Sequence, residues 1–157
     1  MRKRIIGHGL REVAAAEPGW LDLEHLAQVE ITSEDADYPI ESALISDIGS
    51  GWRAAQPGKQ TIRLLFDEPL RLKRIHLVFS EGELERTQEF ALRWSPDGGQ
   101  SYREILRQQY NFSPPEVARE VEDYNLDLDG VTALELKIVP DISDGGSRAS
   151  LAQLRVA

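Results

Sequence analysis

Apolar and polar side chains alternate along three consecutive stretches of the chain, and a period of two indicates half-buried β-strands. The apolar positions are Ile62, Leu64 and Phe66, then Ile75, Leu77 and Phe79, then Phe90, Leu92 and Trp94. Residues 67–70 and 96–101 follow the first and third stretches and carry Pro and Gly, which are typical of tight turns because they suit the turn dihedrals. The pattern predicts an antiparallel sheet.

Further alternating stretches lie on both sides of these three. They predict strands over residues 28–32, 102–110, 117–128, 132–139 and 152–156, with a tight turn at 129–131. Helical spacing is confined to residues 10–26 and is interrupted at Pro18. We therefore expect one domain over 1–157, with an N-terminal arm, helical in part, over 1–26 and an all-β antiparallel sandwich over 27–157. The arm either packs on the sandwich or docks a partner.

Three features resemble the discoidin, or F5/8 type C, domain family of galactose-binding-like β-sandwiches. They are Trp52 ahead of the first central strand, the strand pair KQTIRLLFDEPLRLKRIHLVF, and the segment QEFALRWSPDGGQSYREI. The resemblance covers residues 28–157. It implies a jelly-roll sandwich, a buried Trp52 and ligand binding by loops at one rim.

The lengths of the connections point to the same rim without any family. Successive antiparallel strands run in opposite directions, so their connections fall alternately at the two ends of a sandwich. The long connections are 46–59, 81–87, 108–116 and 140–148, and the tight ones alternate with them. All long loops should therefore share one end, where binding residues tend to concentrate.

The candidate ligand-binding residues on this rim are Arg86, Asn111, Phe112, Tyr110, Glu83, Asp141, Arg53 and Tyr38. Planar Arg and Asn groups suit sugar hydroxyls, and an aromatic face stacks on a pyranose ring. Each residue also has a structural interpretation: the charged residues form a solvated loop, the aromatic pair caps the core, and Asn111 bonds its own loop. If Arg86 is functional, Arg86→Ala should abolish binding and leave the melting temperature nearly unchanged.

The sequence gives little support for a metal site or for enzyme activity. The three His residues lack metal-ligand spacing. The resemblance implies a structural Ca²⁺ with an acid on the last strand, but Gln153 stands there, so Asp47 is left as a possible ligand. No nucleophile elbow is present, and with 27 acidic residues a chance carboxylate pair carries little information. We expect no cofactor and no enzyme activity.

The amino-acid composition limits the classes of partner that the protein can bind. Cysteine is absent, which excludes disulfides, and the net charge of −9 argues against nucleic acid and anionic membranes. The basic N-terminus lacks the apolar region of a signal peptide, and no apolar run is long enough to span a membrane, which predicts a cytoplasmic protein. The long loops read as acidic, without basic or apolar tips. Two functions remain: a module that binds a carbohydrate or sugar-bearing ligand, or a cytoplasmic protein–protein adaptor, with oligomerisation open for either.

Overall fold

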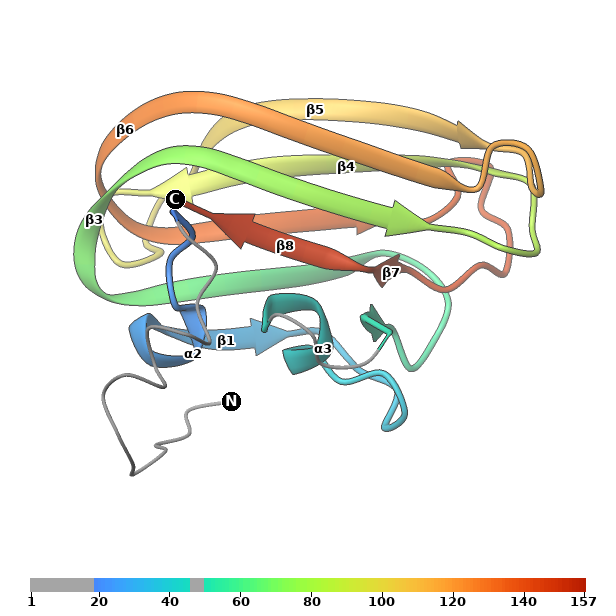
Figure 1. Cartoon of the computed structure of the whole chain (residues 1–157), viewed down its shortest axis with the longest axis horizontal. Helices are drawn as coiled ribbons and strands as arrows, with labels where there is room; N and C mark the ends of the chain where they lie inside the picture. Colours follow the sequence, from blue (N-terminus) through green and yellow to red (C-terminus); the bar gives the residue numbers. More distant parts are fainter. Residues whose placement is uncertain (1–18, 46–49) are drawn as a thin grey trace.

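The computed structural model describes residues 19–45 and 50–157 (Figure 1). Antiparallel strands make up most of it, with two short helices. The elements in chain order are α2 (Leu23–Leu26), β1 (Ala27–Ile31), α3 (Glu41–Leu44), β2 (Trp52–Arg53), β3 (Gln60–Ser80), β4 (Arg86–Ser95), β5 (Arg103–Phe112), β6 (Arg119–Val139), β7 (Ser150–Leu151) and β8 (Gln153–Val156).

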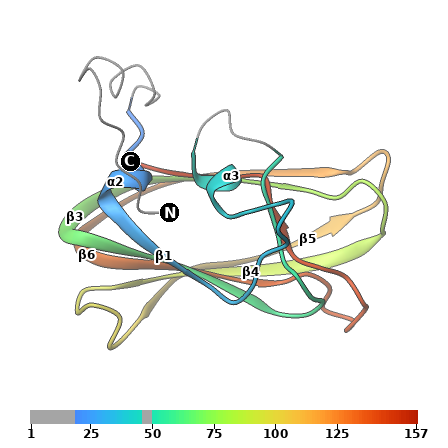
Figure 2. The same cartoon turned by 90° about the horizontal axis from the view of Figure 1, so that it is seen from below.

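Two packed layers form the sandwich, and β3 and β6 belong to both (Figures 1 and 2). The large sheet has the order β1-β3-β6-β4-β5 and uses the first part of β3 and the last part of β6. The small sheet is made of β8, the last part of β3 and the first part of β6. β2 and β7 form a separate two-stranded pair. The predicted antiparallel β-sandwich is confirmed.

The two tight turns predicted at 67–70 and 129–131 are wrong. Residues 67–70 lie within β3, and residues 129–131 lie within β6. The two strands bend together at the end of the molecule drawn on the left of Figure 1. Their register shifts between Leu65 and Leu70 and twice more before Arg74, and Gly130 has φ 71°. Such bulges turn a strand sharply while it stays paired, so turn-type residues here mark a corner and not a hairpin.

The core lies between the two sheets, and the alternation read from the sequence identifies its residues. Ile62, Leu64, Ile75 and Leu77 are each at most 1% exposed. Trp52 is 1% exposed, as the resemblance implied, and its indole Nε1 donates to the Ser33 carbonyl at 3.0 Å. The remaining core members include Phe79, Phe90, Leu92, Phe112, Leu134, Leu136, Ile138 and Leu154. Their burial is the main source of stability.

The helical material is shorter than the sequence predicted. α2 covers the last four residues of the expected arm, and residues 10–14, which carry the helical spacing, lie outside the described part of the chain. Leu21 ties the segment before α2 to the last strand through its N–H, which donates to the Val156 carbonyl at 2.8 Å. Neither helix in the described ranges is long and apolar enough to cross a membrane.

Three of the long connections, 81–87, 108–116 and 140–148, lie together at one end of the sandwich, drawn on the right of Figure 1, as the loop lengths predicted, whereas residues 46–49 of the fourth lie outside the described part of the chain. Backbone hydrogen bonds hold them side by side. The N–H of Glu81 donates to the Ala118 carbonyl at 2.8 Å, and the N–H of Ile142 donates to the Thr87 carbonyl at 2.9 Å. The bends of β3 and β6 occupy the opposite end. A rigid frame therefore presents the loops 81–85, 113–118 and 140–149 as one surface.

Candidate binding groove at the long-loop end

A groove of about 570 Å³ opens at the long-loop end, between the start of β4, the end of β5 and the loop that follows β6. Its walls are Glu85, Arg86, Thr87, Asn111, Phe112, Ser113, Asp141, Ile142 and Ser143. Four of the residues selected from the sequence are brought together here: Arg86, Asn111, Phe112 and Asp141. The other four lie elsewhere.

Arg86 forms the floor of the groove and anchors its surroundings. Its side chain is 1% exposed, and its Nε donates to the Glu81 carboxylate at 2.6 Å. Its Nη1 donates to the Pro140 carbonyl at 2.7 Å and to Gln88 Oε1 at 3.2 Å. These contacts join three segments at one guanidinium. The alternation of β4 turns Arg86 inward because Gln88, Phe90 and Leu92 follow on the same face.

The contact with Arg86 affects the pKa of the Glu81 carboxyl group. Burial raises the pKa of its carboxyl, but hydrogen bonds from Arg86 and from the N–H groups of Glu83 and Leu84 outweigh burial and hold the pKa below its usual value. Glu81 therefore stays ionised and fixes the loop 81–85 onto Arg86. The carboxylate belongs to the scaffold of the groove.

The two aromatic candidates are structural here. Phe112 is 0% exposed and lies beneath the Arg86 guanidinium, 4.7 Å from ring centroid to Cζ. Tyr110 packs edge-on against it with centroids 5.1 Å apart and donates its hydroxyl to the Arg119 carbonyl at 2.9 Å. Tyr110 does not line the groove. A ring as buried as Phe112 cannot stack on a ligand without rearrangement, so the interpretation of the aromatic pair as a cap on the core fits the geometry.

Four polar side chains form the accessible walls of the groove: Thr87, Asn111, Asp141 and Ser143. The Thr87 hydroxyl donates to Asn111 Oδ1 across the β4–β5 pair. Opposite them, the Ser143 hydroxyl donates to Asp141 at 2.7 Å, and the Ser143 N–H does so at 3.0 Å. These two hydrogen bonds keep the pKa of Asp141 below its ordinary value. The walls thus offer one fixed carboxylate, one amide and two hydroxyls.

Three candidates lie away from the groove. Tyr38 and Arg53 form a cation–π pair at 4.8 Å beside β2, close to Asp35, whose backbone N–H donates to the Arg53 carbonyl. Glu83 is exposed in the loop 81–85. None of Tyr38, Arg53 and Glu83 lines the groove.

Thr87 and Ser143 were missed by sequence reasoning. A signal for Thr87 was available, because it follows Arg86 in a strand and must point to the opposite face. Thr87 sits directly across from Asn111 in the ladder. Ser143 carried no such signal, since its position depends on how the loop after β6 folds onto the start of β4.

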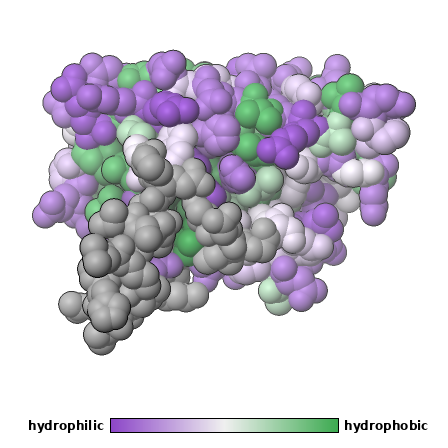
Figure 3. Space-filling view, viewed as in Figure 1, coloured by the Kyte–Doolittle hydropathy of each residue, from purple (hydrophilic) through white to green (hydrophobic). Residues whose placement is uncertain are grey.

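Apolar side chains are exposed on three of the loops, which corrects the prediction of tips without them. Leu84 is 52% exposed, Ile142 is 49% exposed and Val117 is 38% exposed. Each is a single apolar residue in an acidic segment, so composition concealed it. In the space-filling view apolar side chains surface among polar ones over β3 and β6 (Figure 3).

Buried polar side chains lead from the groove into the interior, from Arg86 through Gln88 to Glu120. Gln88, 0% exposed, lies 3.4 Å from Glu120 Oε1, and Glu120 is itself 1% exposed on the inner face of β6. Its other oxygen, Oε2, lacks a hydrogen-bond partner in the described part of the protein. Burial in the first place, and then the like charge of Glu122, raise the pKa of Glu120 to about 9. Glu120 is therefore protonated at neutral pH.

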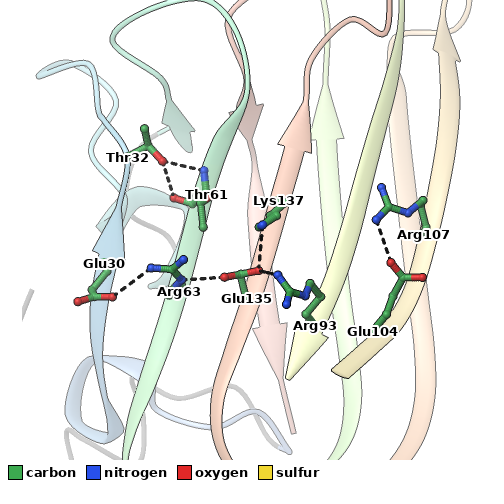
Figure 4. A network of polar contacts seen from close by, with 9 residues as sticks. All are labelled: Glu30, Thr32, Thr61, Arg63, Arg93, Glu104, Arg107, Glu135 and Lys137. Atoms are coloured by element: carbon green, nitrogen blue, oxygen red, sulfur yellow. Dashed lines mark hydrogen bonds and ion pairs between the residues drawn. The ribbon is translucent and has the colours of Figure 1, made fainter. Parts of the chain in front are cut away.

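The outer face of the large sheet carries a transverse row of charges (Figure 4). Glu135, 0% exposed, accepts hydrogen bonds from Arg63 at 2.7 Å and Arg93 at 2.9 Å. The Tyr102 ring lies over both guanidinium groups, at 5.9 and 5.0 Å. The hydrogen bond to Glu135 raises the pKa of Arg63. Since Arg63 and Arg93 both donate to the buried Glu135 carboxylate, we interpret these contacts as a structural ion-pair network.

Comparison with known proteins identifies the architecture. No protein-family model matches the sequence, and a search of curated proteins found no match. Among solved structures, a pectin-binding carbohydrate-binding module has a TM-score of 0.62 at 14% identity, over 84% of this chain and 90% of the module. The family 32 module of Clostridium perfringens NanJ, determined with galactose, has a TM-score of 0.57 at 18% identity, over 83% and 92%.

The chain has the galactose-binding-like fold. The same fold occurs in XRCC1, determined with the catalytic domain of DNA polymerase β, with a TM-score of 0.58 at 17% identity over 84% of this chain and 95% of that one. The structural neighbours of this galactose-binding-like sandwich are mostly binding modules, and they bind carbohydrates or proteins. At these identities the likeness concerns fold alone.

The calcium expectation stays a prediction for this galactose-binding-like domain. Asp47 lies outside the described residues. Gln153 lies in β8 opposite Val78 and supplies an amide where the resemblance implied an acid. Within 19–45 and 50–157, no three His, Asp or Glu side chains are close enough together to hold a metal ion.

Proposed function

We propose that this protein is a non-catalytic binding module whose long-loop groove recognises a carbohydrate or a sugar-bearing ligand. The observation that carries the proposal is the convergence of Thr87, Asn111, Asp141 and Ser143 on one groove of about 570 Å³. Such a volume suits a small ligand of one or two sugar rings. The carbohydrate-binding modules that share the fold support the same class of ligand.

The chemistry of the walls fits sugar hydroxyls. Amide, hydroxyl and carboxylate groups can donate to and accept from vicinal hydroxyls, and Asp141 is held as an acceptor by Ser143. Ile142, half exposed beside them, offers an apolar contact for the C–H face of a ring. Arg86 takes a positioning role, because its donors are engaged by Glu81, Gln88 and Pro140.

A glycan array followed by titration calorimetry tests the proposal. Asn111→Ala should weaken the binding of any glycan hit by at least about tenfold, because one bidentate partner is lost. Asn125→Ala is the matched control, since Asn125 is an exposed asparagine on β6 and does not line the groove. Glycan binding that is equal in both variants, or a blank array, would reject the groove as a sugar site.

A protein partner is the second candidate, and the exposed Leu84, Val117 and Ile142 favour it. Apolar residues on three adjacent loops are the usual centre of a protein interface. A blank glycan array together with a complex that is lost in Leu84→Ser and retained in Asn111→Ala would favour this candidate.

A further inference from the structure

The three loops around the groove carry an excess of negative charge. Residues 81–85, 113–118 and 140–149 contain six carboxylates and one basic residue, Arg148. The carboxylates belong to Glu81, Glu83, Glu85, Glu116, Asp141 and Asp144. Arg148 does not line the groove and lies 3.7 Å from the Asp35 carboxylate. The groove therefore opens into a surface of negative potential.

Most of this charge is not neutralised by an ion pair. Among the six carboxylates, only Glu81 pairs with a cation in the described part of the chain, namely Arg86 at 2.6 Å. Glu85 and Asp141 line the groove and have no ion-pair partner among the described residues. Arg86 is the only cation among the described residues that line the groove, and its side chain is 1% exposed. The accessible charge of the groove is therefore negative.

The carboxylate of Asp141 is held in a fixed orientation at the groove wall. Ser143 donates to its Oδ1 through the backbone N–H at 3.0 Å and through the hydroxyl at 2.7 Å. The second oxygen, Oδ2, takes neither of these bonds. Gly145 leaves space beside it, because a Cβ at that position would lie 2.6 Å from Oδ2. The hydrogen bonds from Ser143 also hold the pKa of Asp141 below its ordinary value, so the groove presents an ionised and positioned carboxylate.

This charge distinguishes between classes of sugar. The hydroxyl of a neutral sugar gains a hydrogen bond with one charged partner from Asp141. An ammonium group on the sugar would gain a bond in which both partners are charged, and such bonds are shorter and stronger. The carboxylate of a uronic acid would meet like charges, without an accessible cation among the described lining residues to compensate them. The groove therefore favours a cationic sugar over a neutral one, and a neutral sugar over an acidic one.

We propose that the groove selects a sugar that carries a free amino group, and that the Asp141 carboxylate binds the ammonium group of this sugar. Thr87 and Asn111 on the opposite wall bind neighbouring hydroxyls, and Glu85 adds a second negative charge to the groove. Selection of an amino sugar rests on the proposed carbohydrate function of the same groove, and the measurements below distinguish the failure of one from the failure of the other.

Titration calorimetry with matched disaccharides tests the proposal. The ligands are β-linked disaccharides of glucosamine, glucose and glucuronic acid, which differ in one substituent per ring, and the galactose series provides the same comparison. At about pH 6 an ordinary amine is protonated. In at least one series we expect the amino sugar to bind about fivefold or more tightly than the neutral sugar, and the acidic sugar to bind most weakly. The preference should shrink as the salt concentration rises.

The outcomes separate amino-sugar selection from sugar binding as such. A neutral sugar that binds as tightly as its amino counterpart, and loses binding in Asn111→Ala, would overturn the selection and leave the groove as a sugar site. No binding of any amino sugar would also overturn it, whatever the glycan array shows. A blank array in addition would reject the sugar site itself.

Asp141→Asn keeps the shape of the side chain and removes its charge. The ratio of the affinities for the amino and the neutral sugar should fall below about twofold. Asp144→Asn is the matched control, because Asp144 lies exposed in the same loop, carries the same charge and does not line the groove. An equal loss of preference in both variants would assign the selection to the general negative potential and overturn the role of Asp141.

A second pair of variants moves the carboxylate without changing the charge. Gly145→Ala places a Cβ 2.6 Å from Asp141 Oδ2, so the carboxylate must shift, whereas Gly146→Ala meets nothing within 4 Å. Neither glycine has a positive φ, so backbone strain does not separate the two. The preference for the amino sugar should fall about twofold or more in Gly145→Ala, because hydrogen bonds weaken steeply with poor geometry, and it should persist in Gly146→Ala. An unchanged preference in both variants would contradict a direct contact between Asp141 and the ammonium group.

Discussion

Arg86 donates to the carboxylate of Glu81 at 2.6 Å from a side chain that is 1% exposed. The same guanidinium bonds the carbonyl that begins the loop after β6 and lies over the buried ring of Phe112. A residue that the sequence suggested as a ligand contact thus holds the groove together from beneath.

Arg86→Ala should therefore lower stability, in place of the unchanged melting temperature that the sequence predicted. Removing one partner of a buried ion pair leaves the other uncompensated, which costs about 3–5 kcal/mol. Urea denaturation measures the loss. Arg107→Ala is the control, because Arg107 is 52% exposed and its ion pairs should contribute less than about 1 kcal/mol. Equal effects of the two substitutions would contradict the anchoring role.

Glu120 should make the protein less stable as pH rises. Its pKa is raised to about 9, so the folded state keeps a proton that the unfolded chain releases near its ordinary pKa. The contribution is complete below the unfolded pKa and declines by about 1.4 kcal/mol per pH unit as pH rises toward 9.

Glu120→Gln mimics the protonated acid and should remove this decline. The urea midpoint of the variant should exceed that of the unaltered protein at pH 8 and approach it at pH 4.5. Glu116→Gln, at an exposed loop position, is the control and should change neither. A pH dependence that survives in Glu120→Gln would assign it to another group.

Glu135→Gln should destabilise the large sheet by about 2 kcal/mol, because Arg63 and Arg93 lose the carboxylate that both bond. Their partial exposure limits the cost. Thermal unfolding provides the measurement, with Glu104→Gln as the control on the same face, since Glu104 is 50% exposed and pairs only with Arg107 among the contacts described. A loss no larger than that of the control would mean that the network contributes little.

Gly51 should be far less tolerant of alanine than Gly58. Both have positive φ, +94° and +97°, so both substitutions carry similar backbone strain. At Gly51 a Cβ would also lie 2.5 Å from the Leu151 carbonyl oxygen, whereas at Gly58 it would meet nothing within 4 Å. We expect the melting temperature to fall by several degrees more for Gly51→Ala. A similar fall in both would show that the β7 segment yields easily.

The candidate site could be predicted in part. Connection lengths alone placed the long loops at one end, because strand direction alternates whatever the details of packing. Asn111 and Asp141, two of the candidates taken from the sequence, line the groove, and their role in binding stays a prediction. The burial of Arg86 and Phe112 could not be read, because it depends on which face of β4 and β5 meets the small sheet, and that contact joins residues far apart in the chain.

The sequence by itself determined the strands and the class of fold. A period of two fixes which side of each strand is apolar, and a half-buried face requires a second layer to cover it. Only the tertiary structure decided that residues 67–70 and 129–131 are corners within continuous strands. Proline and glycine favour a change of direction in either case. Whether the chain reverses or bends depends on the neighbouring strand, because the bulged residues of β3 and β6 remain paired with each other across the corner.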